Sequence, residues 1–113
     1  MLTQVQSPQR NLRKLVFRLN TTTPGTMAFG NADGALTYNG VGDVTIVFSV
    51  PFAALGAVLV SAGSDSATNE YVANYVIADT NGTQVRVIVN DDAGTAADVT
   101  SLSIEVSGID DPG

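Results

Sequence analysis

The feature that most constrains the fold is an alternation of apolar and polar side chains with a period of two residues. It recurs in segments distributed along the whole chain, and it places the apolar residues of each segment on one face of an extended strand. Segments of helical periodicity are missing. The side chains expected to face the interior are Leu15, Phe17 and Leu19; Val44, Ile46 and Phe48; Val85, Val87 and Val89; and Leu102, Ile104 and Val106.

Turn signals separate these segments at intervals of roughly 8 to 14 residues, which is typical of β-sandwiches. Asp33-Gly34, Asn39-Gly40 and Asn81-Gly82 are dipeptides that favour tight type I′ hairpin turns. We therefore predict an all-β fold, an antiparallel β-sandwich or jelly-roll of seven to eight short strands. The expected strands are 13–19, 26–29, 35–38, 43–49, 57–62, 70–78, 83–89 and 101–107, with a connector at 52–55 that contains at most one helical turn.

A chain of 113 residues has room for one core. We expect an N-terminal arm at residues 1–12, a β-sandwich domain at 13–109 and a short acidic tail at 110–113. Only 14% of the residues are charged, compared with roughly 25% in an ordinary soluble domain. That composition suits a subunit that buries much of its surface in an assembly, and equally a small β domain with a mildly polar surface.

The charge is unevenly distributed, because four of the five basic residues lie near the N-terminus while all eleven acids lie at Asp33 or later. Such a basic segment on a chain of net charge −6 is a candidate docking surface for an acidic partner. The alternative is a solvated first strand whose charges meet acids of the same domain. Nucleic acid is not an expected partner, since the acidic body repels phosphate. The candidate docking residues are Arg10, Arg13, Lys14 and Arg18.

Catalysis is not expected, because the chain has neither histidine nor cysteine and so lacks the commonest general base, thiolate nucleophile and metal ligands. No cofactor and no metal site is predicted. The loop Asn90–Asp98 gathers oxygen ligands around Gly94 but lacks the spacing of a calcium loop; we interpret it as a hairpin connection in which Asp98 caps the final strand. A hydrolase built on two carboxylates is the remaining enzymatic alternative.

No membrane span and no secretory signal segment are evident, so we expect no membrane partner. The triplets Asn20-Thr21-Thr22 and Asn81-Gly82-Thr83 are then turn chemistry rather than glycan acceptors. The aromatic residues Tyr38, Tyr71 and Tyr75 are candidates for a carbohydrate-binding platform, with half-buried cross-strand packing as the alternative. On the strand 70–78 we expect Tyr71, Tyr75 and Ile77 to share one face.

Three segments, taken in order, resemble small virion proteins of tailed bacteriophages. They are the opening Arg13–Phe17, the strand Asn39–Phe48 followed by Pro51-Phe52, and the loop Ala93–Asp98 before a Ser/Val strand that ends at Gly108. The likeness is to capsid decoration (cement) proteins and to β domains of phage fibres.

This resemblance implies a non-enzymatic structural protein that decorates and stabilises the capsid. It further implies a homotrimer, made in the host cytoplasm and located on the capsid surface, with the major capsid protein and copies of itself as partners. The alternative that follows from the same resemblance is a receptor- or carbohydrate-binding module of a tail fibre or spike.

Overall fold

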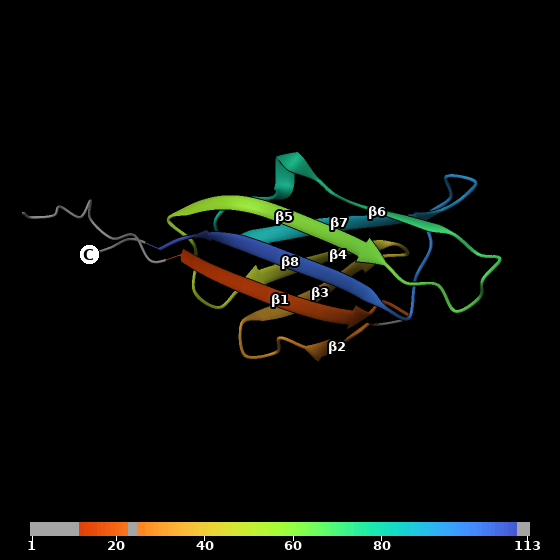
Figure 1. Ribbon diagram of the computed structural model, residues 1–113, viewed down its shortest axis with the longest axis horizontal. Coiled ribbons are helices and arrows are strands. Elements are labelled where there is room, and N and C mark those ends of the chain that lie inside the picture. Colours follow the sequence, from red (N-terminus) through yellow and green to blue (C-terminus); the bar gives the residue numbers. More distant parts are fainter. Residues whose placement is uncertain (1–11, 23–24, 111–113) are drawn as a thin grey trace, which may run out of the picture.

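The computed structural model describes residues 12–22 and 25–110, and these form eight strands and one short 3₁₀ helix (Figure 1). The predicted arm and tail therefore lie outside the described residues, except for Leu12 and Asp110. No helix in the described ranges is long and apolar enough to cross a membrane. The elements are β1 (Leu12–Asn20), β2 (Thr26–Phe29), β3 (Gly34–Gly40), β4 (Asp43–Phe48), β5 (Ala54–Ala62), β6 (Tyr71–Tyr75), η1 (Ile77–Asp79), β7 (Gln84–Asp91) and β8 (Leu102–Ile109).

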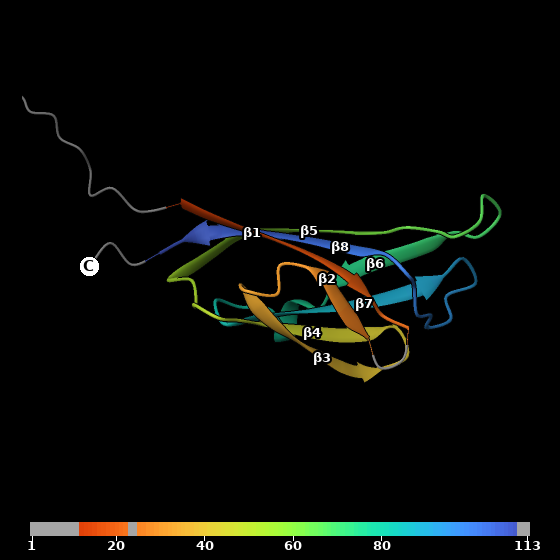
Figure 2. The same ribbon diagram turned by 90° about the horizontal axis from the view of Figure 1, so that it is seen from below.

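The strands form two antiparallel four-stranded sheets, which Figure 2 shows as two layers. Sheet A has the order β2-β1-β8-β5 and sheet B the order β3-β4-β7-β6. This confirms the predicted all-β sandwich and supplies the strand order, which alternation alone leaves open. The chain crosses between the sheets after β2, β4, β5 and β7, so each sheet combines strands that are distant in the sequence.

The core lies between the two sheets and consists of the side chains that the alternation marks as inward. All twelve are buried, from Leu15 on β1 to Val106 on β8, and Phe52 and Val99 join them from the connections. Phe17 of sheet A stacks on Phe48 of sheet B with ring centroids 6.3 Å apart. Phe48 in turn meets the edge of Phe52 at 5.4 Å. Aromatic contacts therefore link the two sheets from the middle of the core to one end.

The hairpin turns predicted at Asn39-Gly40 and at Asp33-Gly34 are both wrong. The β3–β4 turn is formed by Val41-Gly42, because Asn39 and Gly40 belong to β3 and Gly40 pairs with Asp43. Gly42 supplies the left-handed conformation, with φ +66°. Asp33-Gly34 is no hairpin turn either: β3 begins at Gly34 in sheet B, whereas β2 belongs to sheet A.

The strand predicted at 70–78 ends early, at Tyr75, and η1 follows it. Ile77 lies in η1 and is 80% exposed, so it does not share a buried face with Tyr71. The β6–β7 hairpin therefore has a connection longer than Asn81-Gly82. The strand predicted at 57–62 begins three residues earlier, at Ala54, and the connector before it contains no helical turn.

Candidate interaction surface

The outer face of sheet A is a broad surface on which large apolar side chains and basic side chains are exposed together. It is built from the alternate residues of β1, β8 and β5 that point away from the core. We call these residues the outer face. Its cross-strand rows are Leu12, Ile109 and Ala54; Lys14, Ser107 and Ala57; Val16, Glu105 and Leu59; and Arg18, Ser103 and Ser61, with Phe29 of β2 beside Arg18.

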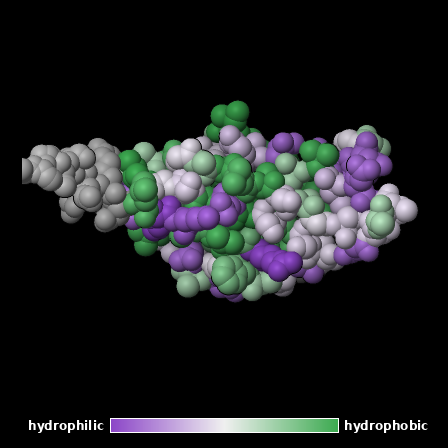
Figure 3. Space-filling view, viewed as in Figure 1, coloured by the Kyte–Doolittle hydropathy of each residue, from purple (hydrophilic) through white to green (hydrophobic). Residues whose placement is uncertain are grey.

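Large apolar side chains are exposed on this face among small ones. Leu12 is 83% exposed, Leu59 63%, Phe29 60% and Val16 39%. In Figure 3, which views this face, hydrophobic residues gather over β1 and β5 on either side of β8. The outward residues of β8 between them are Ser103, Glu105, Ser107 and Ile109, so the two small serines alternate with two larger side chains. An exposed apolar surface of this kind is a mark of protein contacts.

Three of the shallow hollows in the described structure lie on this side of sheet A. The largest, about 390 Å³, is lined by residues such as Leu12, Gly56 and Ile109 at the end of the sheet where β1 begins. A second of about 380 Å³ lies between Val16, Phe29 and Ser103. A third of about 210 Å³ lies beside Leu59 and shares Val16 and Ser103 with the second. None is a deep cavity, so the surface fits a broad protein contact better than an enclosed small molecule.

The charges on the outer face are two basic groups and one acid. Lys14 Nζ lies 3.4 Å from Glu105 Oε2, and both side chains remain substantially exposed. Among the residues that the structure describes, the side-chain partner of Arg18 is neutral: its Nε donates to Ser101 Oγ at 3.4 Å. The outer face thus carries a small positive excess on a chain of net charge −6. Two of the predicted docking residues, Lys14 and Arg18, therefore share the apolar surface.

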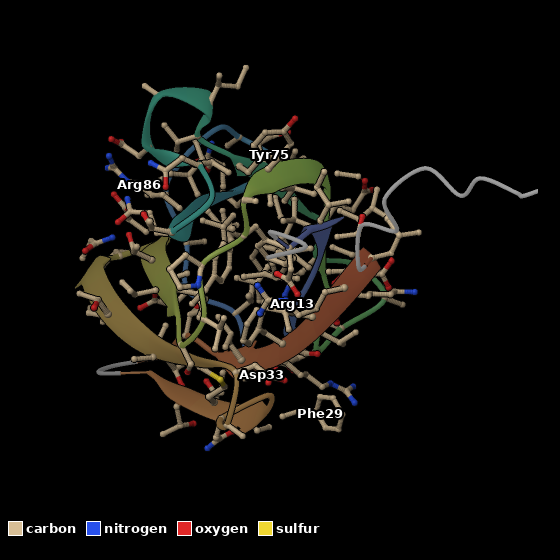
Figure 4. The ribbon with its side chains drawn as sticks, turned by 90° about the vertical axis from the view of Figure 1, so that its left-hand side faces the viewer. Arg13, Phe29, Asp33, Tyr75 and Arg86 are labelled. Carbon is tan, nitrogen blue, oxygen red and sulfur yellow. The ribbon has the colours of Figure 1, made fainter. Side chains whose placement is uncertain are left out.

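Arg13 lies on the opposite side of β1 and closes one end of the core. Its guanidinium carbon lies 4.1 Å from the centroid of the Phe52 ring. Its Nε donates to Asp110 Oδ1 at 3.0 Å and its Nη2 to the Val50 carbonyl at 2.8 Å. Figure 4 shows it pointing between the sheets, whereas Phe29 points outward. Arg13 therefore fits the alternative given above for the basic residues of the first strand: its charge meets Asp110, an acid of the same domain.

Arg13 points to a different side of the sheet from Lys14 and Arg18 because successive residues of a strand face opposite sides. Arg13 lies on the same side as Leu15 and Phe17, which face the core, whereas Lys14 and Arg18 lie on the outer side. The alternation therefore contained the signal that separates them. Arg10, the fourth predicted docking residue, lies outside the described residues.

The three tyrosines do not form a platform. Tyr38 lies on β3 and Tyr71 and Tyr75 on β6, at opposite edges of sheet B. Tyr38 and Tyr71 pack against the core, and Tyr38 Oη donates to Asp98 Oδ2 at 2.8 Å. Tyr75 is 41% exposed and lies close to β5 in Figure 4. This arrangement matches the half-buried packing alternative.

The most concentrated charge cluster of the described residues lies on the outside of sheet B. Arg86 Nε donates to Asp43 Oδ1 at 2.9 Å and its Nη1 to Asp79 Oδ2 at 2.6 Å. Hydrogen bonding from Arg86 holds the pKa of Asp43 below its usual value. A general acid at neutral pH needs a raised pKa, so Asp43 is not suited to acid catalysis. The contacts of Arg86 with Asp43 and Asp79 instead tie β4, β7 and η1 together.

The carboxylates of Asp91 and Asp98, at the two ends of the loop after β7, accept hydrogen bonds from main-chain N–H groups. Asp91 Oδ1 accepts hydrogen bonds from the N–H groups of Ala93 and Thr95, both at 2.9 Å. Asp98 does not cap β8 as expected, because its Oδ1 accepts from the Gly42 N–H at 2.8 Å. Within the described ranges, no three acids come close enough together to hold a metal ion.

Both Asn-x-Thr triplets form local turns. The Asn20 carboxamide oxygen accepts from the Thr22 N–H at 2.9 Å. The Asn81 oxygen accepts from the Thr83 N–H at 2.8 Å and from the Thr83 hydroxyl at 2.6 Å. These contacts agree with the interpretation of both triplets as turn chemistry.

Comparison of the chain with protein-family models, with curated proteins and with solved structures finds no match in any of the three.

Proposed function

We propose that this chain is a non-enzymatic structural protein that decorates and stabilises a phage capsid, and that it docks on the shell through the outer face of sheet A. The single observation that carries the proposal is that face, which exposes large apolar side chains together with the basic residues Lys14 and Arg18. The resemblance to decoration proteins supplies the kind of partner, a shell of protein subunits with acidic groups around an apolar contact.

Docking on an assembled shell would stabilise it by mass action. A ligand that binds the lattice and not the loose subunits favours the lattice at every occupied site. The apolar side chains of the outer face supply the favourable part of such a contact, because burying Leu12, Phe29 and Leu59 removes exposed apolar surface from water. The positive excess of Lys14 and Arg18 favours approach to an acidic surface, and this contribution weakens as the salt concentration rises.

The location is tested by immunogold electron microscopy with an antibody raised against the purified chain. The specimens are phage particles purified from the source of the sequence. Label spread over the capsid is the expected result. Label confined to the tail tip would replace decoration with the fibre or spike alternative, and unlabelled particles would refute a virion protein.

The docking surface is tested with a matched pair of charge substitutions. Val16→Glu places an acid on the outer face, where Val16 is 39% exposed, and Val47→Glu places one on the outside of sheet B, where Val47 is 44% exposed. Particles from which the protein has been stripped are mixed with each variant and sedimented. We expect Val16→Glu to lose binding and Val47→Glu to retain it. Equal binding of the two variants would refute the assignment of the face.

A further inference from the structure

The turn before β7 brings together the groups that convert an asparagine into a succinimide. The Asn81 carboxamide oxygen accepts two hydrogen bonds from Thr83, one from its N–H at 2.8 Å and one from its hydroxyl at 2.6 Å. Gly82 lies between these residues in the sequence, and its N–H has no hydrogen-bond partner among the described residues. Asn81 itself is exposed. A polarised carboxamide therefore adjoins a main-chain nitrogen that is unengaged and has no side chain of its own to shield it.

We propose that Asn81 deamidates through attack by its own main chain. The Gly82 nitrogen bonds to the Asn81 Cγ, and the bond from Cγ to Nδ2 breaks. The proton that the Gly82 nitrogen loses leaves with the amide nitrogen as ammonia, and a cyclic succinimide remains. Water then cleaves one of the two carbon–nitrogen bonds of the imide. Cleavage at the side-chain carbonyl yields aspartate, and cleavage at the main-chain carbonyl yields isoaspartate, in which the chain runs through the side-chain carbon.

The two donors of Thr83 lie where an oxyanion hole would have to be. Attack on the Asn81 Cγ places negative charge on the carboxamide oxygen, and hydrogen bonds to that oxygen strengthen as the charge grows. Both bonds are formed before the attack, so they stabilise the intermediate without reorganisation. Packing also fixes the neighbour of Asn81, because a Cβ at Gly82 would lie 2.6 Å from the Phe52 carbonyl oxygen. The fold thus requires glycine, the residue that hinders this attack least.

The dipeptide Asn39-Gly40 has the same sequence but the opposite hydrogen bonding. Asn39 Nδ2 donates to Asp43 Oδ1 at 3.1 Å and to Thr45 Oγ1 at 2.8 Å, whereas its carboxamide oxygen has no donor among the described residues. The adjacent carboxylate opposes the negative charge that attack would create. Gly40 is also paired with Asp43 in sheet B. We therefore expect Asn39 to remain an amide while the chain is folded.

The turn at Asn20 has the donors but not the free nitrogen. Its carboxamide oxygen accepts from the N–H and the hydroxyl of Thr22, in the same arrangement as at Asn81. The intervening Thr21 N–H, however, donates to the Val99 carbonyl at 2.8 Å, and Thr21 is buried and β-branched. Because the attacking nitrogen is engaged and shielded, Asn20 should also remain an amide.

The proposal is tested on the full folded chain, incubated in mildly alkaline buffer made with heavy-oxygen water. Base removes the proton from the attacking nitrogen, and hydrolysis of the succinimide introduces an oxygen from the labelled water. Chymotrypsin cleaves after aromatic residues and so separates Asn20, Asn39 and Asn81 into different peptides, which are sequenced by mass spectrometry. We expect Asn81 to be labelled at least about tenfold faster than Asn39, as a mixture of aspartate and isoaspartate.

The unfolded chain supplies the reference for this comparison. In urea at a concentration that unfolds the chain, Asn39 and Asn81 should be labelled at similar rates, since each then has only a glycine beside it. If Asn39 were labelled as fast as Asn81 in the folded chain, or if Asn81 took up no label, the proposal would be overturned.

The contribution of the hydroxyl is tested with Thr83→Val, which removes that donor and keeps the N–H. The matched control is Thr83→Ser, which keeps both donors. Thr83 is exposed, and far-ultraviolet circular dichroism of each variant shows that it is folded. We expect Thr83→Val to slow the labelling of Asn81 about tenfold and Thr83→Ser to leave it unchanged. Equal rates in the two variants would overturn the oxyanion role of the hydroxyl. The capsid label and the Val16→Glu result do not depend on Asn81, so this proposal and the proposed function fail separately.

Discussion

The substitution Thr21→Val tests whether a single hydroxyl joins the end of β1 to the segment that leads into β8. Thr21 is 1% exposed, and among the described residues it is the single polar one that is buried. Its Oγ1 accepts from the Val99 N–H at 2.9 Å and donates to the Val99 carbonyl at 3.1 Å. Its own N–H also donates to that carbonyl, at 2.8 Å. The Val99 carbonyl therefore has a second donor, whereas the Val99 N–H depends on the hydroxyl.

Valine has nearly the same shape as threonine but cannot accept this hydrogen bond. The substitution leaves the Val99 N–H buried without a partner, which costs about 1–3 kcal/mol. The control is Thr21→Ser, which keeps the hydroxyl and loses one methyl group, at a cost of about 0.8 kcal/mol. We therefore expect Thr21→Val to destabilise the fold more than Thr21→Ser, although valine is the more apolar residue in a buried position.

Urea unfolding followed by circular dichroism measures the difference. With an m-value of about 1–2 kcal/mol per molar, a loss of roughly 2 kcal/mol lowers the midpoint by about 1–2 M. Hydrogen exchange of the Val99 amide should accelerate in Thr21→Val and change much less in Thr21→Ser. If Thr21→Val were as stable as the unsubstituted chain, or more stable than Thr21→Ser, the argument from the unpaired N–H would be refuted.

Three further substitutions test other contacts. Gly42→Ala should cost about 2 kcal/mol or more, because its φ is +66° and a Cβ would lie 2.4 Å from a carbonyl oxygen of β7; Gly94→Ala, with φ +84° and no atom within 4 Å, should cost only about 1 kcal/mol in the same urea assay. Tyr38→Phe should cost about 1 kcal/mol, since it removes the 2.8 Å bond to the loop carboxylate, and an unchanged midpoint would show that this bond contributes nothing. Asp43→Asn should lower stability at pH 7 and converge with the unsubstituted chain as the pH falls below about 4, because the contact with Arg86 lowers the pKa of Asp43 in the folded state and the stability it contributes is lost on protonation. A difference between these two proteins that stayed constant from pH 7 to pH 3 would contradict that linkage.

Much of the fold was predictable because burial imposes a strict period on a strand. In β1, β4, β7 and β8 every side chain that the alternation assigned to the interior is buried. These four strands lie in the middle of their sheets, with a core on one side and partners at both edges. There the pattern of apolar residues and the pairing register agree, and a shift by one residue would expose the whole apolar set.

The turns were less predictable, because a dipeptide reports only local preference. Asn39-Gly40 and Asn81-Gly82 both favour tight turns, yet no residue other than glycine has a positive φ in the described ranges. The β3–β4 turn moved to Val41-Gly42, where the Gly42 N–H also binds Asp98, 56 residues further along the chain. That contact is tertiary, and no local pattern contains it.

The candidate surface could not be predicted for a similar reason, because a stretch of sequence without charge does not show which of its residues face a partner. The uncharged stretch from Val44 to Ser64 includes the whole of β5 and all of β4 except Asp43. In β4 the outward residues Thr45 and Val47 lie on the outside of sheet B, next to the charged contact between Asp43 and Arg86. In β5 the outward residue Leu59 lies on the outer face of sheet A, in one cross-strand row with Val16 of β1, and both side chains are exposed. Only the strand order brings Val16 and Leu59, which are distant in the sequence, onto one face, so the surface for association becomes visible once the sheets are assembled and not before.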